Sequence, residues 1–288
     1  IVAEITALID TAGTIEHISP SIIKLVNHAF ELPIFELTAD ATFDDIRFWL
    51  QAIATLAGEQ LQDHQLKVYS AQADVNLMHQ LKKLAKTARE MANGMNFAFL
   101  INQERKLLSI GYSQSDNSLD ANCYDLLASE ARLASLFAIA KGDVATKHWF
   151  HLGRTATPLG KGSALISWSG SMFEYLMPSL IMRAPVGSLL EQTNRLVVER
   201  QQSYASQLGI PWGISESGFN ARDIEFTYQY SNFGVPGLGL KRGLSENRVI
   251  APYATGLASM IDPAAAVENY QRLHSIGACG RYGFFEAL

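Results

Sequence analysis

The sequence predicts a mainly α-helical, folded protein. Apolar residues recur at helical spacing through much of the first 95 residues, and again in amphipathic stretches over residues 187–207 and 263–277. The β signals are short apolar runs that flank polar turns. Of 288 residues, 48% are hydrophobic and 18% are charged, which is typical of a folded soluble chain and not of a disordered one.

Charge and cysteine content exclude several classes of protein. The formal net charge is -5 and no basic run occurs, which argues against nucleic-acid binding. Cys123 and Cys279 lack CxxC spacing and predict neither a zinc site nor a disulfide framework, so no metal and no cofactor is expected. Cys123 is expected to be a buried thiol within a helix. No apolar run reaches the roughly 20 residues that span a bilayer.

Residues 1–95 read as a helical segment without catalytic motifs. Helices are expected over residues 2–9, from Pro20 onward, over 43–56 and over 73–93. The residues of the last of these that we expect to face inward are Leu77, Leu81, Leu84 and Ala88. The start of the sequence lacks a Met and a basic signal region, so we expect it to be a cut inside a longer chain.

The pattern changes at Met95, where a second domain is expected to begin. Two short apolar runs, 97–101 and 106–112, flank the polar residues 102–105 and predict a β-hairpin. The residues after this hairpin and a polar loop have helical periodicity over 121–141. We therefore place a domain boundary near residue 95.

Glu130 is the first candidate catalytic acid. In the predicted helix over 121–141 it falls on the same face as Leu126, Leu127 and Leu133. A carboxylate that faces a core is costly unless it is paired or faces a polar cavity. One interpretation is an ion pair with Arg132 or Arg154, and the other is a carboxylate that projects into a substrate cleft.

A second group of candidates lies between a short predicted strand, 164–168, and a helix that ends near Arg183. Ser171 and Glu174 have the spacing of a capping box, in which each side chain accepts a hydrogen bond from the other's backbone. Glu174 is therefore expected to cap the helix or to contact a ligand, not to act in catalysis. The aromatic faces of Trp168 and Tyr175 are candidates to line a sugar site.

Glu216 is the second candidate catalytic acid, and it lies in a loop with two glycines and two aromatic residues. Gly213 and Gly218 permit backbone angles that other residues resist, so they are expected to aim the carboxyl. Trp212 and Phe219 offer faces on which a pyranose ring stacks. The alternative is an ordinary surface turn, since most loops are only connectors.

The remaining chain adds aromatic and glycine-rich segments. Residues 226–230 alternate as in a short strand with aromatic side chains on one face. Residues 233–243 (FGVPGLGLKRG) contain neither GxxxxGK[ST] nor GxGxxG, so a tight loop is favoured over a phosphate site. Helices are expected over 249–261 and 263–277, the second starting at Asp262 and Pro263.

Several motifs resemble the glycoamylase-like middle domain of bacterial cyclic β-1,2-glucan synthases. They are residues 105–112 (RKLLSIGY), 124–133 (YDLLASEARL), 167–178 (SWSGSMFEYLMP), 211–217 (PWGISES), 233–243 (FGVPGLGLKRG), 250–254 (IAPYA) and 280–287 (GRYGFFEA). The resemblance implies an α/α toroid of helical hairpins of the six-hairpin barrel type, with short β-hairpins near the cleft. The family's domain continues past position 288, so the toroid is expected to be incomplete in residues 96–288.

The resemblance also implies retaining transglycosylation, in which a linear β-1,2-glucan chain is cut and its end rejoined into a ring. Such a reaction requires two carboxyl groups about 5 Å apart, one as nucleophile and one as acid/base. Motif matching places the nucleophile at Glu130 and the acid/base at Glu216, and the order of these two roles is less firmly indicated than the pair. The residues expected to contact the sugar are Asp125, Arg132, Trp168, Glu174, Tyr175, Trp212, Tyr228, Tyr230, Arg281 and Tyr282.

The expected partner is β-1,2-glucan. Residues 1–95 are expected to join this domain to a membrane-bound glycosyltransferase region of a larger synthase. The residues of this chain are expected to be soluble, on the cytoplasmic side of a bacterial inner membrane. Two alternatives stay open: an inverting β-1,2-glucanase, whose carboxyls lie roughly 6.5 to 9.5 Å apart, and a glucan-binding module without catalysis.

Overall fold

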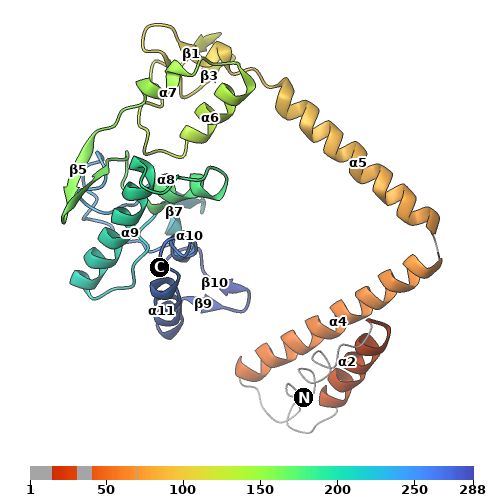
Figure 1. The fold of residues 1–288 in the computed structure, drawn as a ribbon. Coiled ribbons are helices and arrows are strands. Elements are labelled where there is room, and N and C mark those ends of the chain that lie inside the picture. The colour runs from red at the N-terminus through yellow and green to blue at the C-terminus, as the bar shows by residue number, and fades with distance from the viewer. Residues whose placement is uncertain (1–14, 31–40, 70) are drawn as a thin grey trace. The chain divides into compact units, whose positions relative to one another are not determined.

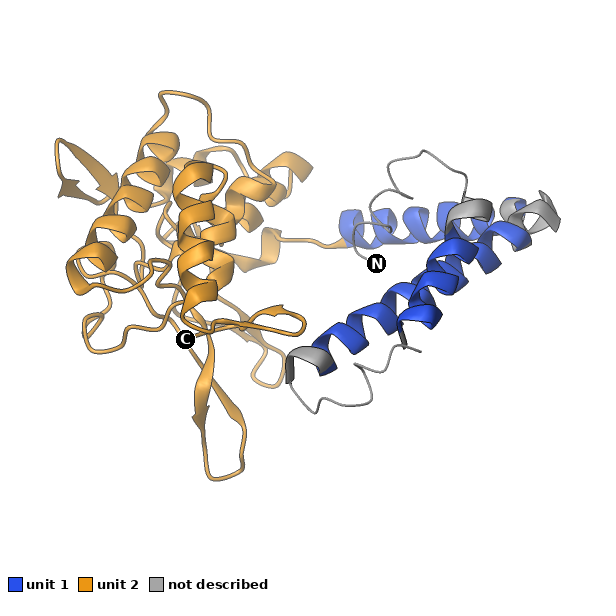
Figure 2. Ribbon diagram, turned by 90° about the horizontal axis from the view of Figure 1, so that it is seen from below, with its two compact units in different colours: residues 1–94 blue, residues 95–288 orange. Residues whose placement is uncertain are grey.

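The computed structural model describes residues 15–30, 41–69 and 71–288 (Figure 1). It is mainly helical, with short two-stranded ribbons between the helices. The chain divides into two compact units, residues 1–94 and residues 95–288 (Figure 2). The helix expected over residues 2–9 lies outside the described residues.

The first unit contains helices α2 (Ile15–Phe30), α4 (Ala41–Tyr69) and α5 (Ala71–Gly94). Helices α2 and α4 pack together through a small buried cluster of Val26, Ala29 and Leu50. The helix predicted to open at Pro20 begins earlier, at Ile15, so Pro20 lies inside it.

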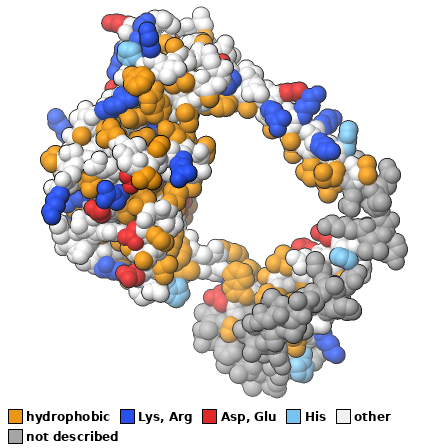
Figure 3. All heavy atoms as spheres, in the orientation of Figure 1, with side chains coloured by type: hydrophobic (Ala, Val, Ile, Leu, Met, Phe, Trp, Pro, Cys, Tyr) orange, Lys and Arg blue, Asp and Glu red, His pale blue; other side chains and the backbone are white. Residues whose placement is uncertain are grey.

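The predicted inward face of α5 is wrong. Its apolar side chains are half exposed or more, at 53% for Leu77, 50% for Leu81 and 66% for Leu84, and Ala88 is exposed as well. Figure 3 shows hydrophobic side chains next to Lys or Arg side chains on the surface of this helix. The helical period was read correctly, but within the described part of this unit no element covers the apolar stripe of α5.

The helices of the second unit are α6 (Arg132–Lys141), α7 (Lys147–His151), α8 (Met172–Leu176), α9 (Leu189–Leu208), α10 (Pro252–Ala258) and α11 (Pro263–Ser275), with the 3-10 turns η1 (Ala98–Leu100) and η2 (Met177–Leu180). Its antiparallel ribbons are β1 (Ile101–Asn102) with β2 (Leu107–Leu108), β3 (Tyr112–Ser113) with β4 (Ser118–Leu119), β5 (Ala156–Leu159) with β6 (Gly162–Leu165), β7 (Ser217–Arg222) with β8 (Tyr228–Ser231), and β9 (Cys279–Gly280) with β10 (Gly283–Phe284). The predicted hairpin around residues 102–105 is confirmed as β1–β2.

The predicted helix over 121–141 is wrong in its first half, because α6 begins only at Arg132. The preceding residues bond to distant backbone instead: Tyr124 donates to Leu108 O at 2.9 Å, and Leu127 donates to Gly153 O at 3.0 Å. An amide that donates across the fold cannot also donate to the carbonyl four residues earlier. Cys123 is buried as predicted, but in this irregular segment and not in a helix.

The later helices match their local sequence signals more closely. Helix α9 begins after Ser188, whose hydroxyl accepts from Glu191 N, and ends at Gly209 with a φ of 70°. Helix α11 begins after Asp262, whose carboxylate accepts from Ala265 N at 3.1 Å. The helix predicted from residue 169 to 183 is shorter, since Pro178 lies where α8 gives way to η2.

Helix α9 contributes one face to the core of the second unit. Its buried face, which includes Val197, Val198 and Gln201, packs against β6 and α8. The core around it gathers side chains from nearly every helix and several ribbons of residues 95–288. The loops that carry the candidate site are attached to this core.

The glycine-rich segment 233–243 is a tight loop, as predicted. A Cβ at Gly239 would lie 2.4 Å from the backbone carbon of Ser169, and a Cβ at Gly234 would lie 1.9 Å from Ser169 O. The loop therefore packs backbone against backbone on Ser169 and Gly170.

The surface carries charges of both signs. In the face shown in Figure 3, Lys and Arg side chains alternate with Asp and Glu side chains over the second unit. Within the ranges described above, none of the helices combines the length and apolar character needed to cross a bilayer.

Gly239→Ala should destabilise the second unit by about 2–3 kcal/mol, because the added methyl group would have to displace main-chain atoms. Gly111→Ala is the matched control, since nothing lies within 4 Å of the place that its added methyl group would take. Denaturant unfolding followed by circular dichroism compares the two. Equal midpoints for the two variants would contradict the close backbone contact.

Candidate active site

A cavity of about 410 Å³ in the second unit gathers four acidic side chains and an exposed tryptophan. The residues that line it are Arg105, Ile110, Asn122, Cys123, Tyr124, Asp125, Leu126, Ser129, Glu130, Trp168, Glu174, Glu216 and Asn232. Both candidate catalytic acids therefore open to one cavity. They come from segments 86 positions apart in the sequence, 216 minus 130.

Glu130 lies in the turn just before α6 and not on a helical face. Its Oε2 accepts a hydrogen bond from Ser129 Oγ at 3.2 Å. Helical periodicity predicted the wrong local structure for Glu130, although its carboxyl does reach the cavity. Helix α6 then carries Arg132 inward, toward the core.

Neither predicted ion pair of Glu130 forms among the described residues. The buried guanidinium of Arg132 donates to three backbone carbonyls: Ser129 O at 3.0 Å, Glu174 O at 3.1 Å and Tyr175 O at 2.7 Å. Arg154 likewise donates to carbonyls of residues 149–152. Burial lowers the pKa of Arg132 to about 10, and the nearby negative charge of Glu130 opposes that shift.

Glu174 is a buried cap, as its sequence spacing predicts. Its carboxylate accepts from Ser167 Oγ at 2.6 Å, from Ser169 N at 3.1 Å and from Ser171 N at 3.2 Å. The capping box with Ser171 is complete. Burial raises the pKa of Glu174, while the hydrogen bonds from Ser167 and Ser169 oppose that rise.

Two buried amides hold the segment that leads to Glu216. Gln201 of α9 donates to Ile214 O at 2.7 Å and accepts from Ile214 N at 3.0 Å. Asn269 of α11 does the same for Trp212, at 2.8 Å and 3.1 Å. Between these two residues Gly213 has a φ of +119°, which a side chain rarely allows. Gly213 therefore does have the special backbone role expected of it, whereas Gly218 does not have a positive φ.

A chain of three hydroxyls connects α8 and α10 to the backbone of Glu216. Ser171 Oγ lies 2.9 Å from Ser215 Oγ, which lies 2.8 Å from the hydroxyl of Tyr253. Tyr253 donates to Glu216 O at 2.7 Å, and Glu216 N donates to Ser171 Oγ at 3.1 Å. The main chain of Glu216 is thus fixed on both of its polar groups.

The carboxyl of Glu216 receives two hydrogen bonds from β8 and the residue that follows it. Tyr230 donates to Oε1 at 2.9 Å, and Asn232 Nδ2 donates to Oε2 at 3.1 Å. Burial raises the pKa of Glu216, and the charges of Glu130 and Glu174 raise it further, while the Tyr230 hydrogen bond opposes the rise. The environment of Glu216 thereby holds the pKa of its carboxyl above its usual range.

Three predicted sugar contacts have to be corrected because their side chains are buried in the protein core. Arg132 is held by backbone carbonyls, as described above. The hydroxyl of Tyr175 lies 2.7 Å from Leu238 O and 2.9 Å from Leu165 O, and its ring is fully enclosed. Trp212 belongs to the hydrophobic core, which removes it from the sugar-facing wall.

Three other predicted contacts lie on the surface away from the cavity lining. Tyr228 is 62% exposed, and its hydroxyl accepts from Arg222 at 2.9 Å. Arg281 and Tyr282 form the turn between β9 and β10. Of the predicted sugar contacts, Asp125, Trp168 and Glu174 line the cavity itself, and Tyr230 reaches the carboxyl of Glu216.

Sequence reasoning missed four residues of the site. Arg105 pairs with Asp125 at 3.0 Å on the cavity wall, and Asn122 lies beside them. Asn232 and Tyr253 bond to Glu216 as described. Arg105 and Tyr253 lie inside the motifs RKLLSIGY and IAPYA, so those motifs did carry the signal. Asn232 lies one position before the motif FGVPGLGLKRG, and its contact with Glu216 becomes apparent only once β8 is paired with β7.

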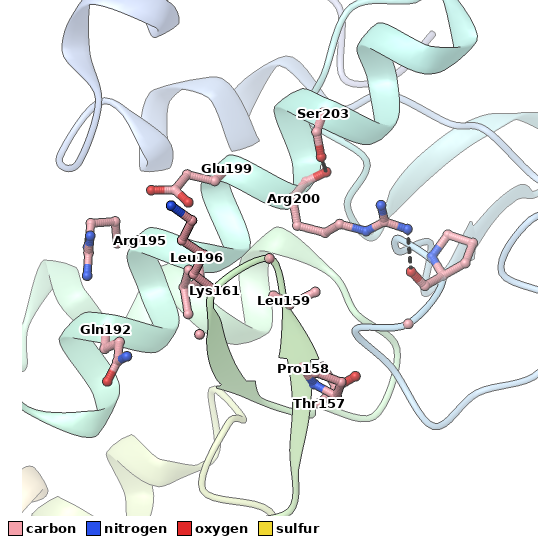
Figure 4. Close-up of a pocket in the computed structure, with 14 residues that line it drawn as sticks. Thr157, Pro158, Leu159, Lys161, Gln192, Arg195, Leu196, Glu199, Arg200 and Ser203 are labelled. Carbon is pink, nitrogen blue, oxygen red and sulfur yellow. Dashed lines mark hydrogen bonds between the residues drawn. The ribbon is translucent and has the colours of Figure 1, made fainter.

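A larger groove of about 740 Å³ lies elsewhere on the second unit, between the β5–β6 hairpin and the outer face of α9. Figure 4 shows Glu199 of the helix near Lys161 of the hairpin, while Arg200 extends the other way and donates to Pro236 O at 3.3 Å. It holds one carboxylate, whereas the smaller cavity holds four. We therefore take the smaller cavity as the candidate active site, because it is lined by four acidic side chains, and not the groove with the larger volume.

In the part of the chain that the structure describes, no three His, Cys, Asp or Glu side chains are grouped in a way that would hold a metal ion. The carboxylates of Glu130, Glu174 and Glu216 instead accept hydrogen bonds from hydroxyl, amide and backbone donors, and that of Asp125 pairs with Arg105.

Comparison with known proteins identifies the family to which this chain belongs. Residues 122–288 match the Glycoamylase family model. The chain belongs to this family, which confirms the resemblance indicated by its motifs. The matched range includes both Glu130 and Glu216.

The chain is also similar to the cyclic beta-(1,2)-glucan synthase NdvB of Rhizobium meliloti (strain 1021). The two are 54% identical over 240 residues, which make up 82% of this chain and 8% of that protein. The chain thus spans a small part of its much longer relative.

Glu174→Gln should lower the free energy of unfolding by about 2–3 kcal/mol, because an amide NH2 would face donors where the buried carboxylate now accepts. Thermal and denaturant unfolding measure the loss. Glu191→Gln is the matched control, since Glu191 lies on the surface of α9 and pairs with Arg195 at 3.9 Å. A catalytic Glu174 without a structural role would leave stability unchanged.

Proposed function

We propose that residues 95–288 act on β-1,2-glucan as a carbohydrate-active enzyme, by retaining transglycosylation that closes a linear chain into a ring. The observation that carries this proposal is that Glu130 and Glu216 line one cavity beside an exposed tryptophan. The synthase name of the 54% identical relative supports the glucan as substrate.

Glu130 is proposed as the nucleophile. Its carboxylate attacks the anomeric carbon and forms a glycosyl-enzyme ester, while the bond to the leaving glycosidic oxygen breaks. Glu216 donates its proton to that oxygen in the same step. The raised pKa of Glu216 supports this role, because an acid must hold its proton until the bond breaks.

The second step restores both acids. Glu216, now ionised, takes the proton of the 2-hydroxyl at the far end of the same chain, and that oxygen attacks the anomeric carbon. The ester to Glu130 breaks and its carboxylate is released. Attack by water in place of the hydroxyl would give a linear hydrolysis product. The access of water to the glycosyl-enzyme ester therefore decides whether the product is cyclic or linear.

The remaining proposals concern the longer protein. We propose that the second unit forms part of an α/α toroid, and that residues 1–95 join it to a glycosyltransferase region anchored in a bacterial inner membrane. The domain would lie on the cytoplasmic side of that membrane. The small share of the relative that this chain covers supports a multidomain parent.

Glu130→Gln and Glu216→Gln should each lower the conversion of linear β-1,2-glucan by about 10³-fold or more, because each removes one partner of the covalent mechanism. Conversion is measured by product chromatography, in the 288-residue chain and in the longer synthase, and binding by calorimetry should persist. Glu199→Gln, in the groove of Figure 4, is the control acid.

The products of the unmodified enzyme separate the alternatives. Ring products support transglycosylation, whereas linear products with a retained anomeric configuration would support the ester mechanism with water as the acceptor. Linear products with an inverted configuration would replace this proposal with a glucanase. Binding without any product from the longer synthase would leave a glucan-binding module, and near-normal turnover of either variant would remove that residue from the pair.

Trp168→Ala should raise the KM for β-1,2-glucan about tenfold and change kcat less, because a stacking face of this size contributes roughly 1–2 kcal/mol to sugar binding. Trp168 is 58% exposed in the cavity wall. Initial rates over a range of glucan concentrations measure both constants. Phe150→Ala removes an exposed aromatic ring outside the cavity lining and is the control, so an equal rise in KM there would contradict stacking at Trp168.

A further inference from the structure

The pairing of β7 with β8 brings two polar side chains to the carboxyl of Glu216. In this ribbon Ser217 pairs with Ser231, and Gly218 pairs with Tyr230. Extending the register by one position sets Glu216 opposite Asn232. Since side chains alternate between the two faces of a strand, Glu216, Tyr230 and Asn232 lie on the same face.

Gly218 provides the room that this arrangement needs. Tyr230 lies diagonally across the ribbon from Glu216, a spacing that a long aromatic side chain can bridge. The residue directly opposite Tyr230 is a glycine, so no side chain blocks the ring as it leans toward Glu216. The N–H of Gly218 donates to Glu286 Oε1 at 2.9 Å, and a Cβ there would lie 2.9 Å from the same oxygen.

We propose that Tyr230 and Asn232 are positioning residues for Glu216: they fix the orientation of its carboxyl and stabilise its ionised form. Tyr230 thereby has a different role from sugar stacking. The proposal rests on the proposed catalytic role of Glu216. It gives the β7–β8 ribbon a function of its own, because its two strands bring the acid and both of its hydrogen-bond donors together at the same end.

The two donors act on opposite oxygens of the carboxyl. Tyr230 holds Oε1 at 2.9 Å and Asn232 holds Oε2 at 3.1 Å, so rotation of the carboxyl breaks both bonds. The backbone of Asn232 is itself held, because Lys241 Nζ donates to Asn232 O at 2.7 Å. The positioning group is thus anchored independently of Glu216.

The two hydrogen bonds also act on the proton of Glu216. Donors to a carboxylate favour its ionised form, so they lower its pKa against the burial that raises it. The other titratable or charged groups around this acid are Glu130, Glu174, Tyr253, Glu286, Lys241 and, in the lining of the same cavity, the paired Asp125 and Arg105. Apart from Lys241 and the paired Arg105 these groups are acids, so loss of a neutral donor is not compensated by a nearby excess of positive charge.

Tyr230→Phe tests the proposal, because it removes one hydroxyl and keeps the ring. We expect kcat/KM on linear β-1,2-glucan to fall about tenfold, mainly in kcat, because the acid loses its orientation. The alkaline limb of the pH profile should move upward, since an acid with a higher pKa keeps its proton to higher pH. Asn232→Ala should move the limb in the same direction, and its backbone bond to Lys241 survives the change.

A direct titration makes the result independent of the enzymatic reaction. The 288-residue chain is labelled with ¹³C at the glutamate side-chain carboxyls, and the Glu216 signal is assigned with Glu216→Gln. Its pKa should rise in Tyr230→Phe and in Asn232→Ala. Tyr228→Phe, a tyrosine on the same strand whose hydroxyl bonds to Arg222, should leave that pKa in place.

The outcomes separate the two proposals. A pKa of Glu216 that stays fixed in Tyr230→Phe and Asn232→Ala overturns the positioning role, even if activity falls through a loss of structure. A raised pKa together with a longer synthase that does not convert β-1,2-glucan supports the positioning role and refutes the proposed reaction. A raised pKa and a shifted alkaline limb support both.

Discussion

Hydrogen bonds from buried side chains to the main chain are the interaction on which the candidate site depends. Each of two amides, Gln201 and Asn269, satisfies both the N–H and the C=O of one residue in the segment before Glu216. In this way each amide side chain makes with one residue the pair of hydrogen bonds that a neighbouring strand would make. Because an unsatisfied buried backbone group costs about 1–3 kcal/mol, these two side chains permit an irregular segment to cross the core. Gly213 lies between the two residues that these amides hold, and its positive φ allows the backbone to turn before Glu216.

The segment of Glu130 is built on the same principle with a different side chain. Arg132 uses its guanidinium to bind backbone carbonyls of its own turn and of α8, so the turn that carries Glu130 is tied to the helix that Glu174 caps. Both candidate acids therefore lie on irregular backbone, yet both are fixed to the core around α9. In both cases side chains from the core hold the irregular backbone in place, and a catalytic group needs such support to keep its orientation.

Local signals in the sequence were sufficient for much of the fold and insufficient for the site. The ends of α9 were predictable because its start and Gly209 carry their own capping chemistry. The start of α6 was not, since long-range hydrogen bonds remove residues 121–131 from the helix that their periodicity predicts. Motifs identified Glu130 and Glu216 as candidates. The sequence did not show that Trp168 lines the cavity while Tyr175 and Trp212 are buried in the core. An aromatic residue carries the same local pattern in a core as in a sugar-binding wall, so only the packed structure distinguishes them.

The hydroxyl chain beside Glu216 runs in a single direction. Tyr253 gives its only proton to Glu216 O, so Ser215 must give its proton to Tyr253, and Ser171 must give its proton to Ser215. No proton in the chain is left over. Tyr253 lies at the end of this hydroxyl chain and is 37% exposed, so with its proton engaged it can accept a hydrogen bond from an approaching group but cannot donate one. The direction of the chain thus gives this side of Glu216 a fixed polarity.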